Sequence, residues 1–237
     1  MAVSKIVRNE QYSRDFYGMT VECPNQARMG QFYMLRAWEN YPLLSRPISV
    51  FDSDGKTVSF LYKVVGKGTE VFAGLKAGDG VTLQGPLGNS FPEVDGKVAL
   101  VGGGVGIAPL FLAAKQLRAA HPGCQLDLYL GFSGQALLTD EYRRAADSVT
   151  IDVGGFITDK VDPSGYDHLL TCGPEIMMRA LYGKCKGADA AKVYVSMENR
   201  MACGVGACLV CSCRTAGGNK KVCKDGPVFK GKEVFGL

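Results

Sequence analysis

The sequence predicts an α+β protein of several domains, and three observations lead to this fold class. Residues 1–96 alternate apolar and polar side chains over short segments separated by Gly, Pro, Asn and Asp, which is typical of a small antiparallel β-barrel. Beyond residue 96, apolar strands alternate with helical segments, which favours a parallel sheet covered by helices. Residues 198–237 are rich in Cys and Gly with little periodicity. We therefore expect domains over 1–96, 97–197 and 198–237.

The barrel strands follow from period-2 patterns, in which one face of each strand is apolar. They are expected at 20–22, 31–37, 48–51, 57–65 and 80–83, with a short helix at 70–75.

The second domain follows from alternating strand and helix patterns, which a right-handed crossover joins into a parallel sheet. Its strands are expected at 97–101, 126–132, 149–152, 169–172 and 192–197, and its helices at 109–120, 137–146 and 175–186.

Composition excludes several classes of function. The chain has 237 residues and 27 Lys and Arg against 23 Asp and Glu, a net charge of +4 that is too mild to indicate nucleic-acid binding. It has only two histidines, which argues against a multi-histidine metal site. No apolar run reaches the ~20 residues of a membrane-spanning helix, and the amino terminus lacks the apolar core of a signal peptide. We expect a cytoplasmic protein that binds neither nucleic acid nor membrane.

The strongest chemical signal is a cluster of cysteines, because five of the nine lie between residues 203 and 223. Cys203, Cys208, Cys211 and Cys223 have the spacing C-x4-C-x2-C-x11-C, which begins like a plant-type [2Fe–2S] site. Structural zinc on four thiolates is the main alternative, and a disulfide or free thiols a lesser one. Cys213 could replace Cys211 or Cys223 as a ligand, although the register favours it as a spare.

A second signal is the run Gly102-Gly103-Gly104-Val105-Gly106 between a strand and a helix. A glycine turn at a helix start can bind a pyrophosphate through its backbone N–H groups. Ile107 stands where the Rossmann fingerprint requires its third glycine, so a plain tight turn remains the alternative. Weaker anion-site signals are Arg46 with Ser49, and the helix start at residues 66–69.

Taken in order, these motifs resemble the ferredoxin-reductase-like superfamily. The motifs are Arg46-Pro-Ile-Ser49, Gly66-Lys-Gly-Thr69, Gly85-Pro-Leu-Gly-Asn-Ser-Phe91, the glycine run and Cys172-Gly-Pro174. The segments 197–208, around the first two cluster cysteines, and 222–229, around the last, are similar to the electron-transfer subunits of class 1B dihydroorotate dehydrogenases. The resemblance covers essentially the whole chain.

This resemblance implies FAD in the barrel, NAD on the second domain and one [2Fe–2S] cluster in a ferredoxin-like C-terminal subdomain. It also implies a separate FMN-containing catalytic subunit in a heterotetramer with two copies of each chain. Electrons from dihydroorotate would pass through FMN, the cluster and FAD to NAD+ for pyrimidine biosynthesis. The orotate site would lie on the partner, so no catalytic residue is assigned here. The implied cofactor residues are Arg46, Pro47, Ile48, Ser49, Gly66, Lys67, Gly68, Thr69, Gly85, Gly88, Asn89, Gly102, Gly103, Gly104, Gly106, Cys172, Gly173 and Pro174.

One departure from the resembled family concerns the acceptor. Relatives usually carry a longer acidic, glycine-rich loop where this chain has residues 149–159. The shorter segment leaves open an acceptor other than NAD. Two further hypotheses remain: a related reductase subunit that serves sulfite reductase, a hydrogenase or a ferredoxin:NADP oxidoreductase, and a redox sensor without flavin.

Overall fold

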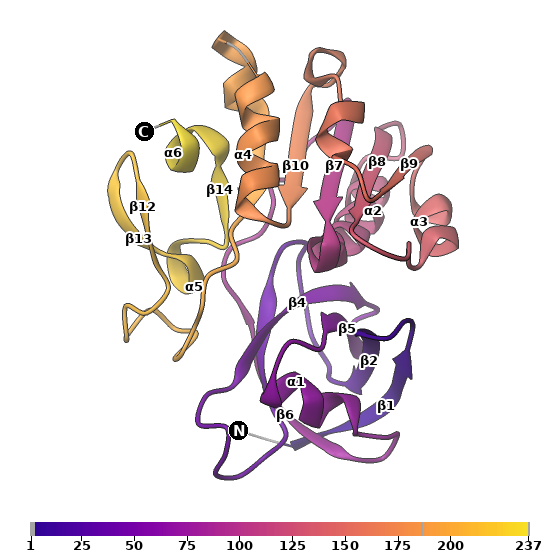
Figure 1. Ribbon diagram of the computed structural model, residues 1–237, viewed down its shortest axis with the longest axis vertical. Helices are drawn as coiled ribbons and strands as arrows, with labels where there is room; N and C mark the ends of the chain where they lie inside the picture. Colours follow the sequence, from indigo (N-terminus) through magenta and orange to yellow (C-terminus); the bar gives the residue numbers. More distant parts are fainter. Residues whose placement is uncertain (1–2, 186, 237) are drawn as a thin grey trace.

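The computed structural model describes residues 3–185 and 187–236 and confirms the predicted fold class. A barrel occupies the lower half of the molecule in Figure 1, and a helix-covered sheet lies above it. The C-terminal subdomain lies beside both, next to one edge of the sheet.

The N-terminal domain is a closed antiparallel barrel with the strand order β1-β2-β5-β4-β3-β6. The sequence analysis did not predict β1, because nearly all of its side chains are solvent-exposed or only partly buried and the strand lacks an apolar alternation. A short helix, α1, connects β5 and β6. The bounds are β1 Val3–Gln11, β2 Phe16–Glu22, β3 Phe32–Arg36, β4 Arg46–Ser53, β5 Thr57–Lys63, α1 Lys67–Ala73 and β6 Gly80–Leu87.

The second domain is a six-stranded sheet with the order β14-β11-β10-β7-β8-β9. All of its neighbouring strands run parallel except β14, which pairs antiparallel with β11. The bounds are β7 Lys97–Gly103, β8 Gln125–Phe132, β9 Ser148–Val153, β10 His168–Cys172, β11 Val193–Ser196 and β14 Val228–Lys230. Since β14 comes from the cysteine-rich segment, the sheet extends across the expected boundary at residue 197.

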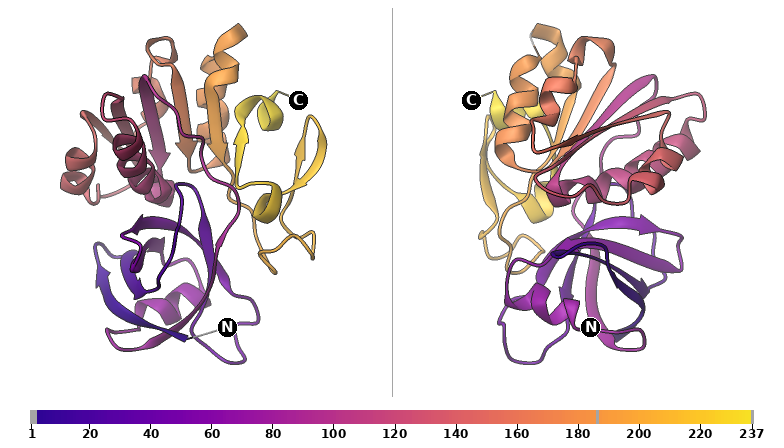
Figure 2. Two further views of the ribbon diagram at one scale, coloured as in Figure 1. Left: turned by 180° about the vertical axis from the view of Figure 1, so that it is seen from behind. Right: turned by 45° about the vertical axis from the view of Figure 1, so that its right-hand side comes forward.

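Helices cover both faces of this sheet, which explains why its central strands are apolar throughout. Val98 and Leu100 of β7 pack into one apolar cluster with α2, while Ala99 and Val101 pack into another with α4. The two helices lie on opposite faces in Figures 1 and 2. Their bounds, with that of α3, are α2 Ala108–Ala120, α3 Thr139–Ala145 and α4 Glu175–Lys184. The expected helix 175–186 therefore ends earlier, and its last residue, 186, lies outside the described part of the chain.

The C-terminal subdomain contains a hairpin and two short helices that its sequence pattern did not predict. These are β12 Ser212–Thr215, β13 Gly218–Lys221, α5 Val222–Asp225 and α6 Gly231–Phe235. Such short elements bury few side chains of their own, so they leave almost no periodicity to read.

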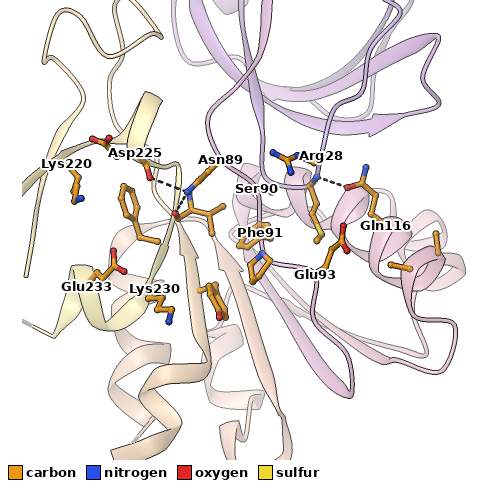
Figure 3. A pocket seen from close by; sticks show the side chains of 17 residues that line it. Arg28, Asn89, Ser90, Phe91, Glu93, Gln116, Lys220, Asp225, Lys230 and Glu233 are labelled. Carbon is orange, nitrogen blue, oxygen red and sulfur yellow. Dashed lines mark hydrogen bonds between the residues drawn. The ribbon is translucent and has the colours of Figure 1, made fainter. Parts of the chain in front are cut away.

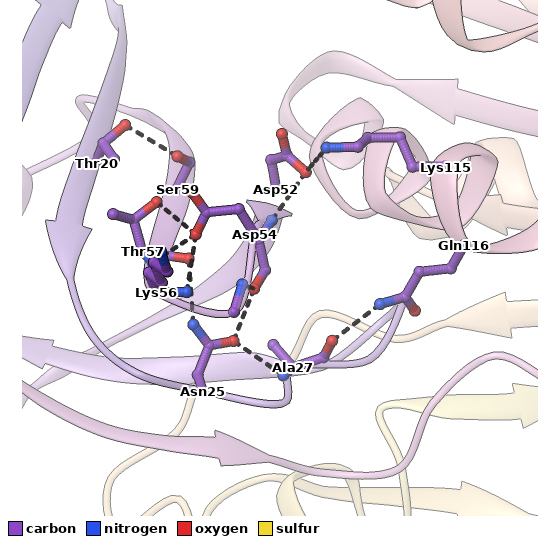
Figure 4. Close-up of polar contacts among 12 residues, drawn as sticks. Thr20, Asn25, Ala27, Asp52, Asp54, Lys56, Thr57, Ser59, Lys115 and Gln116 are labelled. Carbon is purple, nitrogen blue, oxygen red and sulfur yellow. Dashed lines mark hydrogen bonds and ion pairs between the residues drawn. The ribbon is translucent and has the colours of Figure 1, made fainter. Parts of the chain in front are cut away.

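Side-chain hydrogen bonds and an ion pair tie the barrel to the second domain. The Gln116 side chain on α2 donates to Ala27 O at 2.9 Å and accepts from Met29 N at 2.8 Å. Lys115, the preceding residue, forms an ion pair with Asp52 at the end of β4 (Figure 4). The barrel is thereby held against the start of the sheet domain.

None of the helices within residues 3–185 and 187–236 combines the length and apolar character that crossing a lipid bilayer demands.

Candidate functional site

The topological switch point of the sheet lies between β7 and β10, next to the glycine run. The chain moves from β7 to β8 and β9 on one side, then returns to β10 and β11 on the other. In open α/β sheets, ligands bind outside the carboxyl ends of the strands at such a point. The carboxyl ends of β7 and β10 point toward the barrel in Figure 1. Gly102 pairs with Cys172 there, so the structure brings both predicted nucleotide motifs together.

Gly103 and Gly106 of this turn lie in close contact with the segment after β10, and the contact of Gly106 is with backbone. A Cβ on Gly106 would lie 2.5 Å from the Cys172 carbonyl oxygen and 2.5 Å from Gly173 N. A Cβ on Gly103 would lie 2.6 Å from Met177 Sδ. The residues 104–107 form a 3₁₀ turn that leads into α2. The turn is therefore built against the Cys172-Gly173-Pro174 corner and needs no ligand to bring the two together.

A buried tyrosine on α3 also holds the turn. Tyr142 is fully buried, and its hydroxyl donates to Ile107 O at 2.8 Å. Burial raises the pKa of Tyr142 well above its ordinary value, so the hydroxyl keeps its proton as a donor. Its ring lies 5.4 Å from that of Phe111 on α2, and Phe111 stacks on Phe51 of β4 at 4.6 Å. The three rings of Tyr142, Phe111 and Phe51 thus connect the turn to the barrel.

The structure adds one polar residue that the sequence did not reveal. Glu198 follows β11, and its carboxyl oxygen lies 3.6 Å from Cys172 Sγ. Desolvation by the surrounding protein raises the pKa of Glu198, and burial raises that of Cys172 well above its ordinary value. Glu198 belongs to the segment that resembled the family, but nothing in its own spacing marked it. Only the parallel arrangement of β10 and β11 brings it to Cys172.

The barrel gathers a second group of predicted residues, from β4 and α1. A Cβ on Gly68 would lie 2.4 Å from Arg46 Nε and 2.9 Å from the Trp38 ring. The Arg46 guanidinium lies 5.3 Å from the centre of that ring. None of the ion pairs among the described residues involves Arg46. The buried Trp38 Nε1 finds no acceptor in the same part of the chain. A cation and an unused donor beside a glycine fit the phosphates of a dinucleotide.

The other residues of the helix start have local roles. The Thr69 hydroxyl accepts hydrogen bonds from Val65 N at 2.9 Å and Gly66 N at 3.2 Å and donates to Gly66 O at 2.9 Å. Lys67 is exposed and lies 3.7 Å from Glu70. Pro47, Ile48 and Ser49 lie on β4 opposite β3. Their contacts with a cofactor stay predictions.

Gly88 and Asn89 lie where the barrel meets the C-terminal subdomain. The Asn89 side chain donates to Val228 O at 2.8 Å and to Asp225 O at 3.2 Å (Figure 3). A Cβ on Gly88 would lie 2.5 Å from Pro227 Cδ, and one on Gly85 would lie 2.5 Å from the Tyr33 ring. A groove of about 890 Å³ opens beside this junction, but Asn89 is its only predicted cofactor residue. Cofactor contact by these three residues therefore stays a prediction.

The four predicted cluster cysteines form two pairs. The Cys203 thiol lies within hydrogen-bonding reach of that of Cys208, and the Cys223 thiol within reach of that of Cys211. Cys203 Sγ accepts from Val205 N at 3.4 Å, and Cys223 Sγ accepts from Gly206 N at 3.1 Å. Backbone N–H groups, that of Val205 first, lower the pKa of Cys203 to about 6. These N–H groups favour the Cys203 thiolate. Burial and the neighbouring Cys211 instead raise the pKa of Cys223 to about 12.

This arrangement fits two irons better than one metal ion. Each iron of a [2Fe–2S] cluster takes two protein thiolates, whereas structural zinc needs its four ligands around one centre. Among residues 3–185 and 187–236, no three His, Cys, Asp or Glu side chains converge closely enough for one ion. The two cysteine pairs therefore favour the cluster over zinc. Cys213 lies on β12, opposite Lys220.

Comparison with known proteins agrees with this geometry. Residues 198–235 match the family model of the iron-sulfur cluster binding domain of dihydroorotate dehydrogenase B. The electron transfer subunit of dihydroorotate dehydrogenase B (NAD(+)) from Clostridium acetobutylicum is 44% identical, with 98% of this chain and 96% of that one covered. The Clostridium perfringens protein of the same name is 43% identical, with 97% and 96% covered. The chain belongs to this family. The resemblance inferred from its motifs is thereby confirmed.

Solved structures of other proteins share the architecture of this member of the electron-transfer subunit family. The NADH-dependent reduced ferredoxin-NADP oxidoreductase, studied for flavin-based electron bifurcation, has a chain that superposes with a TM-score of 0.88 at 31% identity. That match covers 99% of this chain and 90% of the other. A cytochrome P450 reductase from Amycolatopsis superposes with a TM-score of 0.70 at 25% identity, covering 81% and 68%. The barrel and sheet thus form a ferredoxin-reductase-like pair of domains, to which the cluster-binding segment is added.

Proposed function

We propose that this chain transfers electrons from a dihydroorotate-oxidising, FMN-containing catalytic subunit to NAD+, through its own [2Fe–2S] cluster and FAD, in pyrimidine biosynthesis. When bound, the cluster would supply one-electron transfer, and FAD would supply the conversion of two single electrons into a hydride. The protein's own part is to hold them close together and to exclude water.

The main support for this proposal is the contact between the cluster loop, residues 203–211, and strand β3 of the barrel. Cys211 and Cys223 share an apolar cluster with Phe32 and Met34 of β3. A Cβ on Gly204 would lie 2.7 Å from Met34 Cγ, so the loop rests directly on the strand. β3 pairs with β4, which begins with Arg46. Cluster and flavin would therefore occupy neighbouring sites on one rigid wall, which keeps the electron path short.

The pattern of positive charge and free donors supports FAD in the barrel. Arg46 would face its phosphates, and the missing Cβ of Gly68 leaves room for the Arg46 and Trp38 side chains. Ser49, on the same strand, would reach the isoalloxazine.

Two observations support NAD+ as the acceptor. The glycine turn and the Cys172-Gly173-Pro174 corner form a preformed backbone site at the switch point of the sheet. The relatives from both Clostridium species are named as NAD(+) enzymes. The short segment after β9 would then leave the adenosine end of NAD+ more exposed than a longer loop would.

The name of the relatives as electron transfer subunits supports a catalytic partner, and we propose a heterotetramer with two copies of each chain. We also propose that the protein works in the cytoplasm. All nine of its cysteines are free thiols, and a thiolate cluster site is stable where disulfides are kept reduced.

The decisive experiment tests the cluster and the flavin separately. Cys208→Ser removes a thiolate at the exposed edge of the cluster, so we expect dihydroorotate-driven NADH formation to be lost while FAD stays bound. Cys213→Ser is the matched control and should keep cluster and turnover. Arg46→Ala should instead release FAD during gel filtration and keep the iron. The proposal is overturned if the Cys208→Ser complex passes electrons from the partner to FAD at the normal rate.

A second candidate has the same cofactors and a different partner. The close superposition with a chain of a ferredoxin-NADP oxidoreductase favours it. It predicts that the purified chain binds a second flavoprotein subunit and that dihydroorotate reduces neither of its cofactors. A stopped-flow spectrum with dihydroorotate and the catalytic subunit distinguishes the two.

A further inference from the structure

The positive charge of this protein is concentrated in its C-terminal subdomain. Residues 198–237 contain seven Lys or Arg and three Asp or Glu, whereas residues 1–197 contain twenty of each. The whole net charge of +4 therefore belongs to the cluster-binding subdomain. The ion pairs within residues 3–185 and 187–236 include none of these seven cations. Charge that is confined to one region and left unpaired attracts and orients molecules of the opposite charge.

The β12–β13 hairpin directs two of these cations away from the protein. In the register of the hairpin, Arg214 and Lys221 fall on one face, and Cys213 and Lys220 fall on the other. Cys213 packs against the apolar cluster that lies between the sheet and the subdomain. Arg214 and Lys221 therefore lie on the outward face of the hairpin, which forms an outer edge of the molecule in Figures 1 and 2.

Two further cations extend this outward face. The Asn199 side chain donates to Ser212 O at 3.4 Å, which places Arg200 next to β12. The Lys224 side chain lies over Gly206 of the cluster loop, where a Cβ would be 2.8 Å from Lys224 Cδ. Both cations are exposed. We call the outward group the basic face, and its members are Arg200, Arg214, Lys221 and Lys224.

The three acidic residues of the subdomain have other contacts. Glu198 is directed at Cys172 of β10, with its carboxyl oxygen 3.6 Å from the sulfur. Asp225 and Glu233 line the groove of Figure 3, and Asp225 accepts from the backbone N–H of Lys221 at 2.7 Å. The side chains of the basic face therefore keep their charge for a molecule that approaches from outside.

The basic face adjoins the predicted cluster ligands. Arg214 follows Cys211 by three residues, and Lys221 precedes Cys223 by two. Cys223 N donates to Cys211 Sγ at 3.4 Å, so the base of the hairpin and this buried cysteine pair form one unit. A cluster on these thiolates would lie directly beneath the basic face, within reach of a redox protein held there by charge.

We propose that the basic face binds a small acidic one-electron carrier protein, and that this chain reduces the carrier with electrons from NADH. The inference rests on the proposed function, because it uses the same cluster and FAD. Two carrier molecules would each gain one electron, while one NADH becomes NAD+ and one proton is released. Opposite charges speed the encounter and set the orientation of the carrier, and such contacts are screened by salt.

The binding experiment uses the full chain with FAD and cluster bound, in complex with its catalytic subunit. The probe is an acidic rubredoxin whose iron is replaced by zinc, so that binding is measured without electron transfer. For Arg214→Glu and for Lys221→Glu we expect the association rate constant to fall roughly 10-fold at low ionic strength. High salt should remove the difference. Lys56→Glu is the matched control, because it changes the net charge equally on the exposed β4–β5 turn of the barrel.

The transfer experiment compares two one-electron acceptors of opposite charge. NADH-driven reduction of iron rubredoxin should slow in Arg214→Glu. Reduction of a basic cytochrome c should instead become faster, because the variant removes a like charge from the face. Flavin content, iron content and the reduction of a small uncharged acceptor should not change, which shows that the variant is folded and keeps its cofactors.

Three outcomes overturn the basic face as a carrier site. The first is that zinc rubredoxin does not bind the unmodified complex at low ionic strength. The second is an equal effect of Lys56→Glu, which would assign the attraction to net charge alone. The third is weaker binding of the catalytic subunit with unchanged binding of rubredoxin, which would assign the face to that subunit. If dihydroorotate reduces neither cofactor while NADH still reduces rubredoxin, the proposed function fails and the carrier site stands.

Discussion

Two glycine-rich segments of this protein are built in different ways. The turn at residues 102–106 is fixed by the fold, because Gly106 lies against the backbone at the end of β10 and Tyr142 binds the carbonyl of the next residue, Ile107. The cluster loop has Gly204 and Gly206 at positive φ, and it carries exposed Cys208 at its edge. Backbone N–H groups of Val205, Gly206 and Cys223 donate to thiol sulfurs there. The surrounding fold holds the first segment, and we expect the second to depend on a bound cluster for part of its order.

The difference shows that glycine has two separate uses here. In the turn, glycine removes a side chain so that two backbones can touch. In the cluster loop, it permits a backbone conformation that directs N–H groups at thiolates. Four predictions test this contrast, from the largest expected effect to the smallest.

Removal of iron by a chelator should change the hydrogen-exchange protection of the two segments differently, and this is the largest effect that we expect. We expect amide protons of residues 203–211 to lose most of their protection, because the sulfur atoms no longer share a cluster. Residues 102–107 should keep theirs. Hydrogen exchange followed by mass spectrometry measures both in one sample, and equal loss in the two segments would contradict the contrast.

Gly106→Ala should be the most damaging single substitution in the turn. The new methyl group would lie 2.5 Å from backbone atoms of β10, which cannot move aside as a flexible side chain would. We expect a loss of about 3 kcal/mol in the free energy of unfolding, near the upper end for an overpacked site. Urea unfolding followed by circular dichroism measures it. A variant as stable as the parent would show that the turn is not tightly packed.

Tyr142→Phe should weaken the turn without removing it. The variant leaves the buried Ile107 carbonyl without its donor, which costs about 1–2 kcal/mol. We expect a matching loss of stability together with a raised KM for NADH, while FAD stays bound. A stability loss with an unchanged KM would mean that the tyrosine supports the sheet and not the nucleotide site.

Gly206→Ala should have the smallest effect of the four. The residue has φ 84°, and its new methyl group would lie 2.8 Å from Lys224 Cδ and 3.0 Å from Lys224 Cβ. We expect a cost of about 1 kcal/mol from the strained backbone, with the cluster retained. Iron content and the visible spectrum test this, and loss of the cluster would show that the loop tolerates less change than the contrast predicts.

The sequence predicted the functional motifs better than the elements that position them. The cluster cysteines and the glycine run were found because their chemistry requires fixed spacing along the chain. β1 and β14 were missed, since one strand is largely exposed and the other has only three residues. Trp38 and Glu198 were missed as site residues because their roles depend on partners far away in the sequence.

By itself, the sequence determined the fold class, and it predicts the cysteine ligand set and the nucleotide turn, because local spacing and periodicity are properties of the chain. Only the tertiary structure decided that the cysteines form two pairs, that Arg46 meets Gly68, and that Glu198 meets Cys172. Such contacts arise from strand order and register, which bring distant residues together and which no local pattern records.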